Sequence, residues 1–172
     1  MSIVSDIEKL KKEKNAVILA HYYVDDDVQD VADYIGDSFY LSKVATKVSQ
    51  DRIIFAGVEF MGESAKILNP EKRVFMPDIN ADCPMAHMAD KDEILKLREQ
   101  YDDLAVVCYI NSTAELKKYS DVCVTSSNAV KIVKNLPNKN IFFIPDRNLG
   151  HFVAKQCPDK NFIFNNGCCP RH

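Results

Sequence analysis

Polar side chains that could bind a ligand follow two apolar runs of this chain at the same spacing. His21 and Tyr23 come just after one run, and Tyr109 and Asn111 come just after the other. Where the extended backbone continues beyond a strand, residues two apart point to the same side. One such pair is equally well explained by polar caps at a strand end. Two pairs at equivalent positions favour a shared ligand site that offers imidazole, phenol and amide groups.

Serines stand near two predicted helix starts. Ser38 follows Asp37, and Ser126 and Ser127 precede a helix predicted to begin at Asn128. The unpaired N–H groups and the positive dipole end of a helix N-terminus can hold a carboxylate or a phosphate. Each serine alone is explained by ordinary N-capping. Together with the two strand-end pairs, the serines indicate a site for a small anionic molecule.

Two cysteines are candidates for binding a metal. Cys83 and Cys169 are each followed by proline, which suits the first position of a helix. A short helix is predicted at 84–88, and a cysteine at its positive dipole end favours the thiolate, the form that binds metal. Cys168 lies beside Cys169, and sequence alone separates the two poorly. Neither candidate has the Cys-x-x-Cys spacing of a zinc site.

The remaining cysteines are predicted to be structural. Cys108 and Cys123 lie inside apolar strands and are expected to be packed thiols. Cys157 follows a helix, where the negative dipole end disfavours the thiolate. The first residues, 1–15, are charged and lack the apolar block of a signal peptide. Six irregularly spaced cysteines then indicate a reducing, cytoplasmic compartment, with metal binding or packing favoured over disulfides.

The elements that must position these groups form an internal repeat. The stretch 73–80 is echoed by 141–148, each an apolar strand followed by Pro-Asp-x-Asn. Apolar runs predict strands at 17–20, 53–56 and 74–76 in a first unit and at 105–108, 122–124, 141–144 and 162–164 in a second. Helices are predicted to about Glu13, after a capping box at Ser5, and at 26–35, 38–48, 60–68, 91–101, 113–119, 128–135 and 149–156.

Strands that alternate with helices imply parallel pairing, and such sheets bind ligands at the carboxyl ends of their strands. We therefore predict an α/β fold of two similar three-layer domains with short parallel sheets. The first domain is expected at 1–83, the second at 84–168, and the start of a third at 169–172.

Bulk properties exclude several classes of protein. A net charge of −3 over 172 residues gives no reason to expect nucleic acid or an anionic membrane surface as partner. No apolar run approaches the roughly 20 residues that span a bilayer. The chain has no glycine-rich dinucleotide fingerprint and no phosphate-loop lysine motif, which argues against nicotinamide and nucleotide binding.

Taken in order, the motifs of this chain resemble those of the quinolinate synthase family over essentially the whole sequence. They are Ala-His-Tyr-Tyr at 20–23, Ala-Asp-Tyr-Ile-Gly-Asp-Ser at 32–38, Phe-Met-Gly-Glu-Ser-Ala-Lys-Ile-Leu at 60–68, Met-Pro-Asp at 76–78, Cys-Pro-Met-Ala at 83–86, Tyr-Ile-Asn at 109–111, Thr-Ser-Ser-Asn-Ala-Val-Lys at 125–131, Pro-Asp-Arg-Asn-Leu-Gly at 145–150 and Gly-Cys-Cys-Pro-Arg-His at 167–172.

The resemblance implies an enzyme of de novo NAD biosynthesis, a transferase that condenses iminoaspartate with dihydroxyacetone phosphate to quinolinate. It implies three α/β domains around a 4Fe-4S cluster held by one cysteine from each, with Cys83 and Cys169 as the first two ligands. His21 and Tyr23 are then the expected catalytic residues that shuttle protons. The implied substrate-binding residues are His21, Tyr23, Ser38, Tyr109, Asn111 and Ser126, and His172 matches the histidine that closes the second ligand motif. The resemblance also implies a functional link to the aspartate oxidase or dehydrogenase that makes iminoaspartate.

The chain departs from the family pattern in places. Val24 stands where the family usually has glutamine, Glu59 replaces a histidine, and Cys168 replaces an aromatic residue. The sequence stops where the family continues into a third domain, so that domain and the third cysteine ligand are expected to be absent. We then expect the chain alone to be inactive or weakly active. An alternative is a non-enzymatic two-domain α/β module that binds a small anion or a labile metal.

Overall fold

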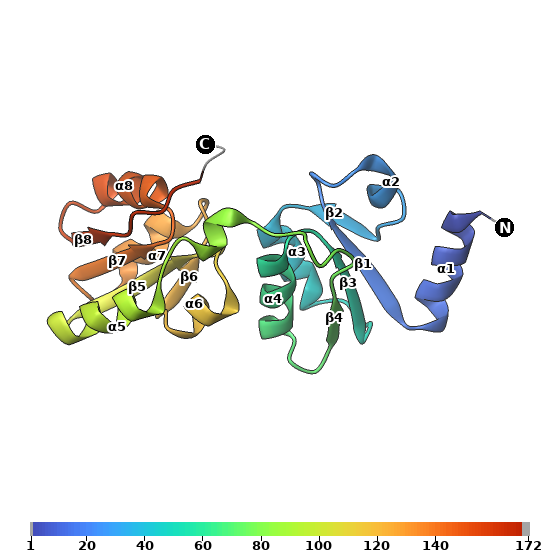
Figure 1. Ribbon diagram of the computed structural model, residues 1–172, viewed down its shortest axis with the longest axis horizontal. Helices are drawn as coiled ribbons and strands as arrows, with labels where there is room; N and C mark the ends of the chain where they lie inside the picture. Colours follow the sequence, from blue (N-terminus) through green and yellow to red (C-terminus); the bar gives the residue numbers. More distant parts are fainter. Residues whose placement is uncertain (1, 170–172) are drawn as a thin grey trace. The chain divides into compact units, whose positions relative to one another are not determined.

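The computed structural model describes residues 2–169, which form two compact units. The first unit extends to Asp82 and the second begins at Cys83. Each unit contains one four-stranded parallel sheet with helices packed on it (Figure 1). The predicted α/β class with two similar layered domains is confirmed. The boundaries predicted after Cys83 and Cys168 stay predictions, and most of the segment 169–172 lies outside the described residues.

The sheet of the first unit has the order β2-β1-β3-β4. Its strands are β1 (Ala16–His21), β2 (Tyr34–Gly36), β3 (Arg52–Ala56) and β4 (Arg73–Phe75), and its helices are α1 (Ile3–Glu13), α2 (Asp26–Gln29), α3 (Ser38–Ala45) and α4 (Glu59–Leu68). The central strand β1 is apolar and buried from Val17 onward, as expected for a parallel strand covered on both faces. Helices α3 and α4 contribute Leu41, Phe60 and Met61 to the core.

The sheet of the second unit has the corresponding order β6-β5-β7-β8. Its strands are β5 (Leu104–Tyr109), β6 (Val122–Val124), β7 (Asn140–Ile144) and β8 (Asn161–Phe164), and its helices are η1 (Pro84–His87, a 3-10 helix), α5 (Lys91–Gln100), α6 (Ala114–Lys118), α7 (Ala129–Asn135) and α8 (Arg147–Gln156). Within the described part of the chain, no helix is long and apolar enough to cross a membrane.

Alternation along β5 and β7 divides the core of the second unit between the two faces of the sheet. Val107 and Phe143 pack with Val133 of α7 and Val153 of α8. On the other face, Val106, Cys108 and Phe142 pack with Ile94 of α5 and Leu116 of α6. The second unit is therefore a three-layer sandwich, with a fully buried hydrophobic layer on each side of the sheet.

The structure corrects two predictions in the first unit. Residues 26–35 were expected to form one polar helix, but the helix α2 ends at Gln29 and the edge strand β2 begins at Tyr34. The first sheet therefore has four strands, one more than predicted. The capping box at Ser5 is also wrong, because Ser2 caps α1 and Ser5 lies inside the helix, where its hydroxyl donates to the Ser2 carbonyl.

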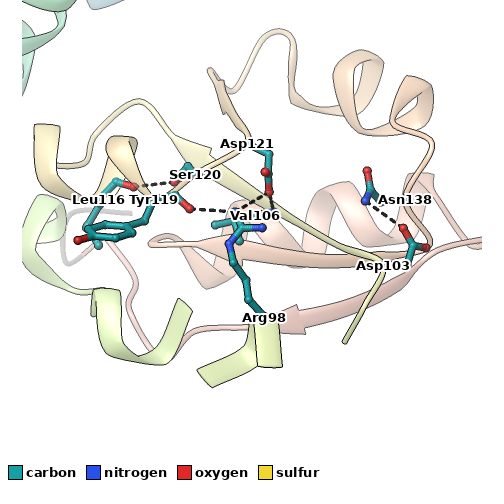
Figure 2. A network of polar contacts seen from close by, with 8 residues as sticks. All are labelled: Arg98, Asp103, Val106, Leu116, Tyr119, Ser120, Asp121 and Asn138. Carbon is teal, nitrogen blue, oxygen red and sulfur yellow. Dashed lines mark hydrogen bonds and ion pairs between the residues drawn. The ribbon is translucent and has the colours of Figure 1, made fainter. Parts of the chain in front are cut away.

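An aspartate before the edge strand ties each central strand to the α-helix that precedes that strand in the chain. In the second unit, Asp121 Oδ2 accepts hydrogen bonds from the Val106 N–H at 2.7 Å and from Arg98 Nη2 of α5 at 2.9 Å (Figure 2). In the first unit, the Asp33 carboxylate accepts from the Ile18 N–H at 2.8 Å and lies 2.8 Å from Lys11 Nζ of α1. The two units therefore share this detail as well: in each, a buried backbone N–H of the central strand donates to an aspartate that is paired with a basic side chain.

A lysine before the last strand of each sheet binds carbonyl groups after a helix. Lys72 Nζ donates to the carbonyls of Ala45 and Val48, which lie at and beyond the end of α3. Lys160 Nζ donates to the carbonyls of Leu136 and Asn138 after α7, at 2.8 Å in both cases. Cations are favoured at helix C-termini, where the last carbonyls lack helical partners. These lysines satisfy carbonyl groups that would otherwise need water.

Candidate functional site

The carboxyl end of the first sheet positions His21 beside the start of α3. His21 is the last residue of β1 and pairs in register with Gly36, the last residue of β2. The Tyr22 N–H donates to the Gly36 carbonyl at 3.1 Å and continues this pairing by one bond. Ser38 follows Gly36 by two residues and is the first residue of α3. Two strand ends and a helix N-terminus therefore meet at this edge.

The second sheet repeats this arrangement with other side chains. Tyr109 ends β5 and pairs in register with Val124, the last residue of β6. The Ile110 N–H donates to the Val124 carbonyl at 2.8 Å, in the place of the Tyr22 bond. Asn111 follows Tyr109 by two residues, and Ser126 follows Val124 by two. Each of the six predicted substrate-binding residues therefore lies at or just beyond a carboxyl strand end of its own unit.

His21 is almost fully buried and is surrounded by aromatic rings. Its side chain is 6% exposed, and its ring centroid lies 4.4 Å from that of Tyr22 and 3.9 Å from that of Tyr23. Burial lowers the pKa of His21 below its usual value, although the negative charge of Asp37 opposes the shift. The imidazole is therefore neutral at pH 7.

One contact fixes the tautomer of this imidazole. The Tyr23 N–H donates to His21 Nδ1 over 3.4 Å, so Nδ1 carries no proton and the neutral ring has its proton on Nε2. An Nε2–H group can donate a hydrogen bond to a substrate oxygen. His21 in this state is suited to polarise a carbonyl or hold a carboxylate.

The backbone does not continue in the extended conformation beyond β1. Residues 22 and 23 form a turn, closed by a hydrogen bond from the Val24 N–H to the His21 carbonyl at 3.0 Å. The extended strand that was expected to place His21 and Tyr23 on one side is therefore not formed. Their rings nevertheless meet, because the turn folds Tyr23 back over the imidazole. Tyr23 is 52% exposed.

The serines do not cap the helices. Asp37 is the N-cap of α3 and accepts from the Tyr40 N–H at 2.7 Å, which leaves Ser38 inside the first turn. At the start of α7 the N-cap is Asn128, whose side chain accepts from the Thr125 N–H at 2.7 Å. Ser126 is exposed in the turn between β6 and α7. Neither Ser38 nor Ser126 is therefore an N-cap: Asp37 caps α3, and the Asn128 side chain makes no capping hydrogen bond to α7.

The two candidate metal ligands lie on segments of the second unit that contact each other. Cys83 is the N-cap of η1, with proline at the first position as predicted, and η1 ends beside Met88. Asn165 Nδ2 donates to the Met88 carbonyl at 2.6 Å, and Gly167 packs against Met88 and Pro145. Because these contacts hold the approach to Cys169 against η1, both cysteines are anchored to the same part of the unit.

Thiol chemistry fits an iron–sulfur cluster at these positions. Cys83 and Cys169 are half-buried and neither is in a disulfide, so both can supply the thiolates that iron–sulfur clusters use. Among residues 2–169, no group of three or more His, Cys, Asp or Glu side chains is arranged to hold a metal ion. Cys168 is also half-buried, and burial does not separate it from Cys169. His172 lies outside the described residues.

The structure separates the other cysteines. Cys157 is buried, and burial raises the pKa of its thiol, as expected of a structural residue. Cys108 is buried in the core as predicted. Cys123 is exposed, so its prediction as a packed thiol is wrong. It lies on the short edge strand β6, where one side of the strand lacks a neighbour, and an apolar run cannot show that.

Sequence reasoning missed two residues that shape the site of the first unit. The negative charge of Asp37 acts to raise the pKa of His21, and Tyr22 contacts the imidazole ring. The position of Asp37 before a predicted helix could have drawn attention to it. Its influence on His21, however, depends on the pairing of β1 with β2. That pairing was not predicted because β2 itself was missed.

Tandem α/β units with polar groups at their carboxyl strand ends place this chain in the class of parallel α/β proteins, in which ligands commonly bind at that edge. A family model described as "Quinolinate synthetase A protein" matches residues 5–172. The chain belongs to this family.

Curated relatives agree with this assignment. The chain is 65% identical over 166 residues to the quinolinate synthase of Fusobacterium nucleatum, covering 96% of this chain and 56% of that protein. It is 56% identical over 166 residues to the quinolinate synthase of Clostridioides difficile, and 54% identical over 170 residues to that of Caldicellulosiruptor saccharolyticus. These matches cover 96% and 99% of this chain and 55% and 56% of those relatives. The chain spans about half the length of the curated relatives it matches.

Proposed function

We propose that this chain contributes substrate- and cluster-binding residues to a quinolinate synthase, which condenses iminoaspartate with dihydroxyacetone phosphate and releases phosphate and water. The observation that carries this proposal is the 65% identity with a relative named quinolinate synthase across 96% of the chain. The relatives are nearly twice as long as this chain. We therefore assign the complete reaction to this chain acting together with a segment that corresponds to the rest of the relatives' sequence. The iminoaspartate would come from an aspartate oxidase or dehydrogenase.

His21 and Tyr23 are the proposed catalytic residues. The neutral imidazole of His21, with its proton on Nε2, donates a hydrogen bond to a substrate oxygen that gains negative charge during condensation. The ring of Tyr23 contacts this imidazole in a tilted arrangement, and Tyr23 adds a hydroxyl that can give or take a proton. Because His21 is almost fully buried, water competes poorly for its N–H, which strengthens the hydrogen bond to substrate.

Four further residues are proposed to hold the anionic groups of the substrates. Ser38 lies in the first turn of α3, where helix N–H groups favour a carboxylate or a phosphate. Tyr109, Asn111 and Ser126 offer hydroxyl and amide donors at the matching edge of the second sheet. Hydrogen bonds from such groups orient a substrate without neutralising its charge.

Cys83 and Cys169 are proposed as thiolate ligands of a 4Fe-4S cluster. When bound, a cluster with one iron open to substrate supplies Lewis-acid chemistry toward a substrate oxygen. The protein's part is to hold the two thiolates in place. Proline at the start of η1 and the hydrogen bond of Asn165 with Met88 fix the backbone near each of them.

Anaerobic reconstitution with iron and sulfide tests the ligands. We expect Cys83→Ser and Cys169→Ser each to lower the iron content and the visible absorbance severalfold. The exposed Cys123→Ser is the matched control and should leave both unchanged. Retention of full iron content by both ligand variants would remove these cysteines from the proposal.

A quinolinate assay tests the reaction. The chain is mixed with the remaining portion of the Fusobacterium nucleatum relative, and formation of quinolinate is followed with and without His21→Ala. We expect product with the unmodified chain and at least a hundredfold loss with the variant, as for removal of a key donor in a buried site. Absence of product from a mixture that holds a cluster would favour a binding module without turnover.

A further inference from the structure

The second unit contains a pair of thiols that the proposed function does not use. Cys108 of β5 and Cys123 of β6 are register partners in a parallel pair of strands, so their side chains lie on the same face of the sheet. Cys108 packs in the core with Leu116 of α6, and its thiol donates to the Tyr109 carbonyl over 3.4 Å. One thiol is fully buried and the other is exposed.

The surroundings of this pair stabilise one negative charge. The hydrogen bond from Cys123 lowers the pKa of Cys108 to about 7, with help from Ser112, Ser120 and the positive charge of Lys117, although burial opposes the shift. The same hydrogen bond and burial raise the pKa of Cys123. The two sulfurs therefore titrate as a coupled pair that gives up its first proton near neutral pH.

The separation of the two strands allows a covalent bond. Neighbouring strands lie about 4.8 Å apart, which falls inside the Cα separation of roughly 4.4–6.8 Å over which disulfides form. We propose that Cys108 and Cys123 form a redox-active dithiol, in which exposed Cys123 reacts with a low-molecular-weight disulfide and buried Cys108 resolves the product.

The steps balance as thiol–disulfide exchange. The pair gives up one proton, the other proton stays on Cys108 until the next step, and the Cys123 sulfur attacks one sulfur of the small disulfide, which forms a mixed disulfide and releases one small thiolate. Cys108 thiolate then attacks the Cys123 sulfur, which forms the Cys108–Cys123 bond and releases the second thiolate. The two released thiolates take up the two protons. The small disulfide is reduced by two electrons, and the protein dithiol is oxidised by two.

Oxidised glutathione and peptide mass spectrometry test this proposal on the folded chain. Trypsin cuts after Lys117 and Lys118, between the two cysteines, so the bond joins two separate peptides. We expect this linked pair, lighter by two hydrogens, to form about tenfold faster than any modification of Cys157, which is buried and out of reach of glutathione. Cys108→Ser should instead keep a stable glutathione adduct on Cys123.

Because Cys123 is exposed, a substitution there provides a second variant if Cys108→Ser fails to fold. Cys123→Ser should keep the fold, lose the linked peptides and leave Cys108 unmodified, because the inner thiol is out of reach of glutathione. Two results would overturn the proposal. One is a lasting glutathione adduct on Cys123 in the unmodified chain. The other is modification of Cys108 in Cys123→Ser at the rate seen in the unmodified chain.

Discussion

The ring of Tyr23 packs at a tilt of 40° against the ring of His21, with 3.9 Å between their centroids, although the backbone between them turns away from the strand. The tilted phenol ring helps to cover the imidazole, which is only 6% exposed. A buried neutral histidine of this kind couples the stability of the fold to pH.

His21 should make the first unit less stable in mild acid. Its pKa is lowered in the folded state, so the unfolded chain binds a proton more readily as pH falls below the ordinary value of 6.5. The stability that the neutral ring provides is present above pH 6.5 and is lost as pH falls toward the folded-state pKa. Thermal unfolding followed between pH 7 and pH 5 should show this decline.

His21→Gln should flatten that dependence, because glutamine does not titrate. An equal slope in His21→Gln and the unmodified chain would contradict a buried neutral His21.

Removal of the Asp121 carboxylate should destabilise the second unit. Asp121→Ala leaves the buried N–H of Val106 without its partner at 2.7 Å, and an unsatisfied buried donor costs about 1–3 kcal/mol. Urea unfolding measures the free energy of unfolding. Glu115→Ala, which removes only an exposed ion pair with Lys91, is the control and should change little. Equal losses in the two variants would mean that the Val106 bond is replaced by water.

Lys72 should stabilise the end of α3. Lys72→Met keeps the length of the side chain but removes two hydrogen bonds to the carbonyls of Ala45 and Val48, which we expect to cost about 1–3 kcal/mol. Lys47→Met, at an exposed position nearby, is the control. Hydrogen exchange at α3 should quicken in the first variant only. Unchanged hydrogen exchange at α3 would mean that water can replace Lys72 as the hydrogen-bond donor to these carbonyls.

Gly167→Ala should displace the segment that leads to Cys169. A Cβ at this position would lie 2.7 Å from both Met88 Cβ and the Pro145 carbonyl, and the backbone oxygen cannot rotate away. Overpacking of this kind costs typically 1–3 kcal/mol. We expect a lower iron content after reconstitution and a modest loss of stability.

Gly57→Ala is the control for crowding, since its nearest neighbour is the flexible Met61 side chain at 3.0 Å. Full iron content in Gly167→Ala would mean that the position of this segment does not matter for the ligands.

Sequence patterns predicted the central strands well because each is a continuous apolar run. The runs at 17–20 and 105–108 became β1 and β5, and the strands that follow took the same order in both units. The edge strand β2 was missed because Tyr34–Gly36 is short, half exposed and preceded by polar residues typical of a helix. Its presence is decided by pairing with β1 and not by its own composition.

The candidate site could be predicted only as a set of residue types at strand ends. That His21 pairs with Gly36, and Tyr109 with Val124, depends on register, which no single-sequence pattern fixes. The contrast between buried Cys108 and exposed Cys123 depends on which strand forms the edge of the sheet. Local sequence gives both the same apolar neighbours.

The order of strands in the first sheet has a consequence for synthesis of the chain. All four strands lie between Ala16 and Phe75, and none is borrowed from beyond Asp82. The first half therefore possesses all of its pairing partners once it has emerged from the ribosome. It can reach its final hydrogen-bonded form while the second half is still being translated, and domains that fold in this way expose their apolar strands only briefly.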